Sequence, residues 1–236
     1  MAAVTEPRDK LQMLARRFAD ADALDRPLDQ KLAEYVARSR EIVPDVIAAY
    51  DRLVSRLCET VGQGAPQIGE QMPEFLLPDQ GGNLVSLSEL IRTGPAVVSI
   101  NRGHWCPYCR LELRALARAH PLLDRRGAQI VSIVPETAMF TNKLAEEHAL
   151  PFKILTDVDL GYALSIGLMI WVGDEVIELY KTLGIDLPRF QGNDSWFLPI
   201  PATFVVGQDR RIRAGFVNPD FRHRMTIEQI DAALQA

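Results

Sequence analysis

The stretch Ser99–Arg114, Ser-Ile-Asn-Arg-Gly-His-Trp-Cys-Pro-Tyr-Cys-Arg-Leu-Glu-Leu-Arg, decides the fold of this chain. It contains Cys106 and Cys109, and it begins within an apolar run that predicts a buried strand at 96–100. Apolar residues after the cysteines recur at helical spacing and predict one buried helical face. The Cys-Pro-Tyr-Cys motif therefore lies where a strand passes into a helix. The residues of that helical face are Leu113, Leu116, Ala119 and Leu123.

The position of the motif predicts different roles for its two cysteines. With Pro107 in the first helical turn, Cys106 lies at the helix N-terminus and Cys109 lies one turn later on the same side. Free backbone N–H groups and the helix dipole stabilise a thiolate there. We therefore predict that Cys106 is an acidic, exposed nucleophile. We also predict that Cys109 is the more buried partner, which resolves the mixed disulfide or sulfenic acid formed at Cys106.

The residues beside the motif complete this candidate site. Arg102 and Arg110 add positive charge near the thiols, and Trp105 and Tyr108 supply a flat apolar surround. A cysteine at a helix N-terminus does not need a neighbouring base. We therefore interpret His104 as an exposed or hydrogen-bonded loop histidine.

Composition narrows the classes of function. The chain has 236 residues, 47% of them hydrophobic, and a formal charge of −5, which argues against nucleic acid or an anionic membrane as the main partner. Apolar runs of about 18 residues and a signal-peptide pattern are both lacking in the sequence, so we expect a soluble, cytoplasmic protein. Three cysteines are too few for a disulfide scaffold, which leaves a catalytic or metal-binding pair.

The sequence divides into an N-terminal helical extension, residues 1–64, and an α/β domain, residues 65–236. Residues 8–61 have three amphipathic segments that are separated at Pro27 and Pro44. The extension packs against the core or against a second subunit of a homodimer, and the sequence leaves both open. We interpret Cys58, near the end of the third segment, as a buried inert thiol. Glycine and proline then mark a linker, at Gly62, Gly64, Pro66 and Gly69.

The second part of the chain alternates predicted strands and helices, which indicates right-handed crossovers and a parallel core. The long loop at 184–196 is a candidate for specificity or for an interface. In chain order the predicted elements are hairpin strands at 74–77 and 84–86, a helix at 89–92 capped by Ser86 or Ser88, a strand at 128–134, a helix at 137–148, a strand at 151–155, a helix at 158–168 interrupted by Gly161, a strand at 170–172, a helix at 175–183, strands at 202–206 and 212–217, and a closing helix capped by Thr226.

Four segments in this order resemble the alkyl hydroperoxide reductase and thiol-specific antioxidant (AhpC/TSA) family, the peroxiredoxin-like branch of the thioredoxin-fold superfamily. The resemblance covers about residues 68–236. It implies a central mixed sheet flanked by helices, an antiparallel strand pair closing the sheet, and a cis Pro201 that faces the disulfide. The four segments are Met72–Asp79, Arg102–Cys109, Pro201–Val206 and Asn218–Arg222.

The resemblance implies a thioredoxin-dependent peroxidase in which Cys106 reduces hydroperoxides and Cys109 resolves the product. It implies no cofactor beyond the Cys106–Cys109 disulfide and no metal, with a thioredoxin- or glutaredoxin-like protein as external reductant. It implies a small hydroperoxide or a protein disulfide as the substrate. The substrate-binding residues that it indicates are Arg102, Gly103, Trp105, Pro107, Tyr108 and Pro201.

Three positions depart from the peroxiredoxin pattern and keep other functions open. Gly103 stands where the family carries threonine or serine, Ser99 where it carries proline, and Pro201 where it carries arginine. The motif also suits a general thiol-disulfide oxidoreductase, or a redox sensor or interaction protein that oxidises without turnover. A zinc site is a further alternative, with Cys106 and Cys109 completed by His104 or His120, although a structural zinc site requires four ligands.

Overall fold

The computed structural model describes residues 7–60 and 64–235. Three helices open the chain, as predicted: α1 (Pro7–Ala23), α2 (Leu28–Ile42) and α3 (Pro44–Thr60). Pro27 and Pro44 separate them because a proline starts a helix well but cannot continue one. Residues 61–63, including Gly62 of the predicted linker, lie outside the described residues. Within the described residues, no helix is long and apolar enough to cross a membrane.

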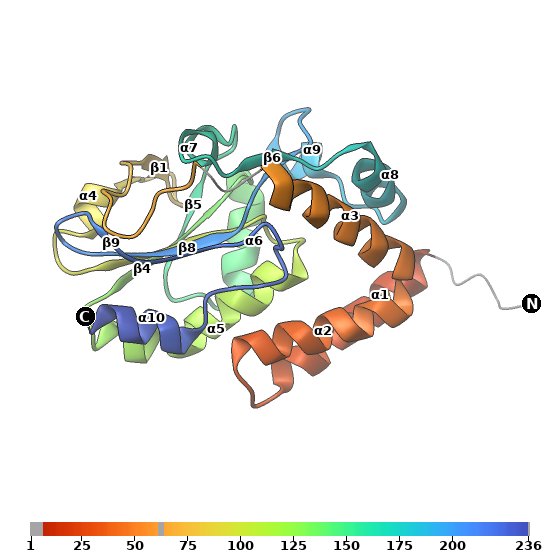
Figure 1. The fold of residues 1–236 in the computed structure, drawn as a ribbon, viewed down its shortest axis with the longest axis horizontal. Helices are drawn as coiled ribbons and strands as arrows, with labels where there is room; N and C mark the ends of the chain where they lie inside the picture. Colours follow the sequence, from red (N-terminus) through yellow and green to blue (C-terminus); the bar gives the residue numbers. More distant parts are fainter. Residues whose placement is uncertain (1–6, 61–63, 236) are drawn as a thin grey trace, which may run out of the picture.

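A five-stranded mixed sheet forms the centre of the fold, in the order β5-β4-β3-β8-β9 (Figure 1). Strands β3, β4 and β5 run parallel, whereas β8 pairs antiparallel with β3 and with β9. This arrangement confirms the predicted thioredoxin-like α/β fold with its antiparallel closing pair. The strand bounds are β3 (Ala96–Ile100), β4 (Gln129–Val134), β5 (Lys153–Thr156), β8 (Ala202–Val206) and β9 (Ile212–Val217).

Both faces of the sheet are covered, which explains why its inner strands are continuous apolar runs. Val97 points into a core formed with α5, α6 and α10, while Val98 points into the larger core on the other face. Helices α5 and α10 lie side by side below the sheet in Figure 1. The remaining bounds are β1 (Leu76–Pro78), β2 (Leu84–Ser86), α4 (Leu87–Leu90), α5 (Pro107–Asp124), α6 (Ala138–Glu147), α7 (Gly161–Ser165), β6 (Met169–Trp171), α8 (Asp174–Thr182), α9 (Leu187–Gln191), β7 (Phe197–Pro199) and α10 (Ile227–Leu234).

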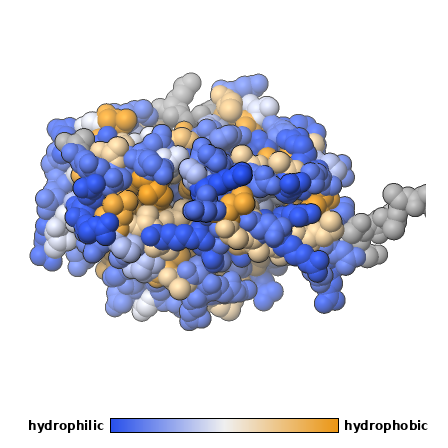
Figure 2. Space-filling model, turned by 90° about the horizontal axis from the view of Figure 1, so that it is seen from below, coloured by the Kyte–Doolittle hydropathy of each residue, from blue (hydrophilic) through white to orange (hydrophobic). Residues whose placement is uncertain are grey.

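The N-terminal helices pack against the core of the same chain. Helix α2 contacts α5, and α3 lies beside α8 (Figure 1). The Tyr35 ring meets the Tyr108 ring edge-on at 5.4 Å, and Tyr50 meets Phe221 at 5.0 Å. The face seen in Figure 2 is mainly hydrophilic, with apolar residues in small groups between charged ones. The apolar side of the extension is thus used within one chain, while a homodimer stays a prediction.

Outside the cysteine pair, the structure differs from the sequence expectations in the following ways. Cys58 is exposed instead of buried, because it lies off the apolar face of α3. The predicted helix at 158–168 shortens to α7, since Leu160 adopts a φ of 55° just before it and the Asp157 carboxylate accepts the first backbone N–H groups. The loop at 184–196 contains α9, whose start is capped by Asp186. The Ile200–Pro201 peptide bond is trans, so the expected cis geometry is wrong.

Candidate active site

The Cys-Pro-Tyr-Cys motif lies at the junction between β3 and α5, as its sequence predicted. Cys106 is the N-cap of α5, and Pro107 occupies the first turn, where its missing N–H leaves no hydrogen bond unmade. Cys109 lies one turn later, which brings its Sγ to 2.9 Å from the Sγ of Cys106. In this geometry the Cys109 thiol donates a hydrogen bond to Cys106. The two sulfurs are therefore placed to form a disulfide with a small movement.

Burial of the cysteines is the main difference from the expected site. Both Cys106 and Cys109 are 0% exposed, so the prediction of an exposed Cys106 is wrong. The N-terminal extension packs beside the start of α5, where the Tyr35 ring contacts the Tyr108 ring. A cavity of about 160 Å³ lies between the extension and the motif. Its walls are mainly apolar and include Phe18, Tyr35, Tyr50, Trp105, Pro107 and Tyr108.

Arg102 holds a buried positive charge beside the sulfur of Cys106. Its Nη2 lies 3.4 Å from the Cys106 Sγ, and the residue is only 2% exposed. The guanidinium stacks over the ring of Phe221 at 3.7 Å and over Trp105 at 5.2 Å. Its Nε has no hydrogen-bond partner among the described residues. The charge on Cys106 is the largest favourable electrostatic influence on this cation.

The electrostatics of the two thiols are opposite in direction. Burial alone would raise the pKa of Cys106, but the hydrogen bond from Cys109 and the charges of Arg102 and Arg224 hold that pKa well below its ordinary value. Burial raises the pKa of Cys109, and its hydrogen bond to Cys106 and the Cys106 charge raise it further. The electrostatics therefore favour the thiolate at Cys106 and the thiol at Cys109.

The backbone at Gly103 is shaped by Glu136, a residue that the sequence did not single out. Gly103 has a φ of 120°, and a Cβ built on it would lie 2.3 Å from the Glu136 Cδ. The Glu136 carboxylate accepts the His104 N–H at 2.7 Å, and its other oxygen lies 2.6 Å from the His104 Nδ1. A threonine at position 103 would therefore collide with Glu136. His104 is a hydrogen-bonded loop histidine, as interpreted from the sequence.

The other predicted site residues lie in the motif, next to it and at the start of β8. Trp105, Pro107 and Tyr108 lie beside the motif and line the cavity. Pro201 is buried directly before β8, whose Ala202 pairs with Ile100 at the end of β3. Arg110 also lines the cavity. Its guanidinium covers the Phe18 ring at 4.2 Å, and its Nε donates to the His148 Nε2 at 3.1 Å. Arg110 therefore joins the extension and α6 to α5.

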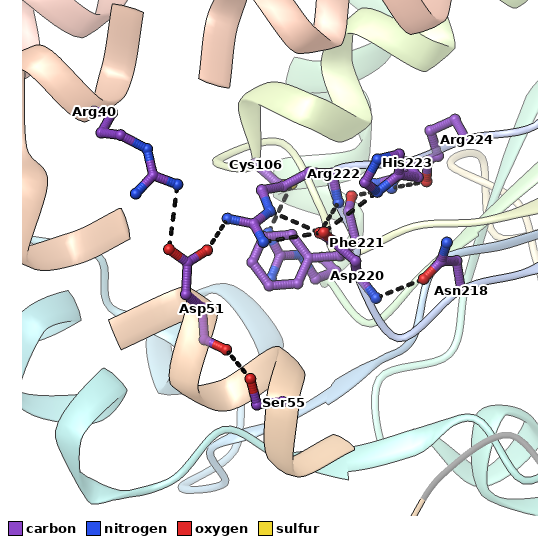
Figure 3. A network of polar contacts seen from close by, with 11 residues as sticks. Arg40, Asp51, Ser55, Cys106, Asn218, Asp220, Phe221, Arg222, His223 and Arg224 are labelled. Carbon is purple, nitrogen blue, oxygen red and sulfur yellow. Dashed lines mark hydrogen bonds and ion pairs between the residues drawn. The ribbon is translucent and has the colours of Figure 1, made fainter. Parts of the chain in front are cut away.

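A tail segment, residues 218–224 after β9, delivers side chains that the sequence did not assign to the site. Phe221 lies under the Arg102 guanidinium, and Arg224 reaches the Cys109 Sγ with its Nη2 at 3.5 Å. Figure 3 shows Asp51 of α3 between Arg40 of α2 and Arg222 of this tail segment. The tail segment is thus tied both to the cysteines and to the helices that cover them. The family resemblance of Asn218–Arg222 was the one feature of the sequence that could have drawn attention to this segment.

Glu112 is a further residue of the site that the sequence missed. It lies on α5 one turn after Cys109 and is buried, with its Oε2 2.7 Å from the Nε of Arg224. A charged residue between Leu111 and Leu113 could have drawn attention to it, because a buried carboxylate requires a partner. Across residues 7–60 and 64–235, no group of three or more histidine, cysteine or carboxylate side chains is placed to hold a metal ion.

Comparisons with known proteins identify the family of the chain. A family model described as the AhpC/TSA family matches residues 68–214. A search of the curated proteins found no match.

Among solved structures, the peroxidoxin BcpB from Mycobacterium tuberculosis is 21% identical with a TM-score of 0.56, covering 72% of this chain and 97% of that chain. The reduced Prx3 of Vibrio vulnificus in complex with H2O2 is 16% identical with a TM-score of 0.56, covering 72% and 96%. A yeast mitochondrial 1-Cys peroxiredoxin is 17% identical with a TM-score of 0.51, covering 72% and 75%. At these identities the likeness concerns the fold.

Proposed function

Because the chain belongs to the AhpC/TSA family and is an oxidoreductase, we propose that it is a thiol peroxidase that reduces hydroperoxides at Cys106 and resolves the product with Cys109. The single observation that carries this proposal is the cysteine pair, with its sulfurs 2.9 Å apart and the Arg102 Nη2 3.4 Å from Cys106. A thiolate beside a fixed cation is the reactive form of cysteine toward peroxide.

The reaction follows from the two protonation states. The Cys106 thiolate attacks the terminal oxygen of the hydroperoxide; an S–O bond forms, the O–O bond breaks, and the alkoxide leaves and takes up a proton. Cys106 is then a sulfenic acid, and Cys109 attacks its sulfur to form the disulfide with release of water. An external dithiol reduces the disulfide by exchange and is itself oxidised. Each cycle converts one hydroperoxide and one dithiol into one alcohol, one water and one disulfide.

Arg102 takes the place of the missing arginine and threonine of the family pattern. Its guanidinium lies beside the sulfur that attacks, so it can also stabilise the negative charge that develops on the oxygens of the peroxide. Trp105, Tyr108 and the apolar wall of the cavity exclude water from this charge, which strengthens its attraction to Arg102. For the reductant, we propose a thiol of the thioredoxin or glutathione type.

Peroxide consumption by single variants tests the proposal. Cys106→Ser removes the nucleophile and is expected to abolish turnover. Cys109→Ser keeps the first step and is expected to stop after one equivalent of peroxide unless an external thiol resolves the sulfenic acid. Arg102→Gln is expected to slow the first step at neutral pH by at least about tenfold, because the neighbouring cation is lost. Unchanged peroxide turnover in Cys106→Ser would end the peroxidase proposal.

General thiol-disulfide exchange is the second candidate function. The specific observation that favours it is Gly103, which leaves no hydroxyl for peroxide at that position because Glu136 occupies the space. Reduction of a protein disulfide by the wild type, dependent on both cysteines and without peroxide consumption, would establish exchange as the activity.

A further inference from the structure

A buried ion pair, Arg224 with Glu112, lies beside Cys109. Arg224, from the end of the tail segment, and Glu112, from α5, have side chains that are 1% and 3% exposed. Burying two charges is costly, and such a pair is weak evidence for stability alone. The position of the pair against a redox-active sulfur therefore calls for a chemical explanation.

The guanidinium of Arg224 is fixed on all sides but one. Its Nε donates to Glu112 at 2.7 Å, and its Nη1 donates to the carbonyl oxygens of Phe221 and, at 2.8 Å, His223. The other oxygen of Glu112 accepts hydrogen bonds from the hydroxyls of Ser99 at 3.1 Å and Thr203 at 2.8 Å. The Nη2 that remains lies 3.5 Å from the Cys109 Sγ. The network thus holds one cation against one sulfur.

The charge of the cysteine pair moves during the proposed reaction, and this gives Arg224 its role. In the resting pair the negative charge is on Cys106, beside Arg102, and Cys109 is a thiol that donates to it. Peroxide converts Cys106 into a neutral sulfenic acid, so the neighbouring charge that opposed ionisation of Cys109 disappears. The cation at 3.5 Å then favours the Cys109 thiolate.

We propose that Arg224 is a catalytic residue of the resolving step, in which it stabilises the attacking thiolate of Cys109, and that Glu112 positions it. This inference rests on the proposed peroxidase function. In the step, an S–S bond forms between Cys109 and Cys106 and the S–O bond of the sulfenic acid breaks. The hydroxide that leaves combines with the proton released from Cys109 to give water.

The charged and titratable groups around Cys109 agree with this role. In the sulfenic state they comprise two guanidinium groups and one carboxylate, together with a tyrosine that stays neutral because burial raises its pKa. The excess of positive charge favours a thiolate at Cys109. These groups are Arg102 in the loop before α5, whose backbone N lies 3.4 Å from the sulfur, Arg224 in the tail segment, Glu112 in α5 and Tyr180 in α8.

The test measures the resolving step separately from the peroxide step in the same protein. Pre-reduced protein is mixed with hydrogen peroxide and quenched at intervals with a sulfenic-acid trap, and intact mass gives the fractions of sulfenic acid and disulfide. For Arg224→Gln we expect resolution about tenfold slower at neutral pH, with its pH profile displaced to higher pH. Because a more basic thiolate is a better nucleophile, the variant should match or exceed the wild type once Cys109 is fully ionised.

Further variants that should move the pH profile of the resolving step in opposite directions separate an electrostatic effect from damage to the fold. Arg224→Lys keeps the charge and should restore part of the rate. Glu112→Gln keeps a hydrogen-bond acceptor for Arg224 but removes a negative charge near Cys109. Ionisation of Cys109 becomes easier, so the pH profile of the resolving step should move to lower pH. Arg222→Gln is the matched control, because Arg222 lies two residues away and pairs with Asp51 and Asp220 instead of a sulfur.

The outcomes distinguish this inference from the function on which it rests. If peroxide produces no sulfenic acid at Cys106 of the wild type, the proposed peroxidase function fails. If the sulfenic acid forms and Arg224→Gln resolves it with the pH profile of the wild type, the role of Arg224 is overturned while the peroxidase function stands. Equal displacement in Arg222→Gln would likewise overturn the role of Arg224.

Discussion

Replacement of Tyr35 by alanine should expose the active-site cysteines. Tyr35 belongs to α2 and is 4% exposed, and its ring contacts Tyr108 beside Cys109 and Phe18 of α1. Truncation of a buried aromatic side chain costs about 3 kcal/mol or more, because the lost contacts leave a cavity. The Tyr35 side chain lies between the extension and the core, so most of this cost falls on the closed position of the extension.

The size of the effect follows from that free energy. A loss of about 3 kcal/mol increases the population in which the extension has separated from the core by about a hundredfold, since each 1.4 kcal/mol is about a factor of ten. Both cysteines are 0% exposed in the closed position, so a bulky thiol reagent reaches Cys106 only after opening. The rate of Cys106 labelling in Tyr35→Ala should therefore rise by up to about a hundredfold.

The assay contains its own reference. Cys58 is exposed on α3, and its labelling rate, followed by mass spectrometry of the same sample, reports the reactivity of the reagent. Met13→Ala is a control in the same extension, because Met13 is 41% exposed on α1. Labelling of Cys106 that stays at the wild-type rate in Tyr35→Ala would refute the argument that the extension closes the site. So would labelling of Cys106 as fast as Cys58 in the wild type.

Two further predictions concern stability. Gly103→Ala should lower the free energy of unfolding by about 2 kcal/mol or more, because the φ of Gly103 is 120° and the new Cβ meets Glu136. Gly69→Ala is the control: its φ is 89° and nothing lies within 4 Å of the Cβ, so it measures the part of the loss that comes from backbone conformation alone. Equal losses for the two variants in denaturant melts would rule out the clash with Glu136. Burial and the charges of Arg110 and Arg114 lower the pKa of His148 from 6.5 to about 4 in the folded protein. As the pH falls, the unfolded chain is therefore protonated at His148 before the folded protein is. Stability should fall as the pH drops from about 6.5 to about 4, and His148→Gln should lose this part of the pH dependence.

The sequence predicted the central architecture because local signals and packing agree there. The apolar run at 96–100 and the helical face after Cys109 each specify one element, and both are buried as expected. The N-cap position of Cys106 follows from the same junction. By contrast, α9 has only five residues, one of them proline, and depends on a single aspartate cap, so hydrophobic spacing gave little information about it.

Burial of the site could not be predicted because it depends on contacts distant in sequence. The apolar residues of α1 to α3 indicate that the helices have a buried side, but spacing within a helix does not say which surface it covers. Tyr35 covers Tyr108, which is far along the chain, and Asp51 pairs with Arg222 near the other end. For the same reason the helical spacing placed Cys58 near a buried face, although its side chain points to solvent.

The departures from the family pattern are explained by where this chain obtains its positive charge. At position 103 the space for a hydroxyl side chain is filled by Glu136, and at position 201 proline replaces arginine. Arg102 approaches Cys106 from the loop after β3, and Arg224 approaches Cys109 from the tail segment. Both guanidinium groups act on both thiols, with Arg102 at 3.4 Å from Cys106 and Arg224 at 3.5 Å from Cys109. This arrangement supports the proposed reaction, in which both cysteines act as thiolates in turn, because it supplies positive charge without an arginine at position 201.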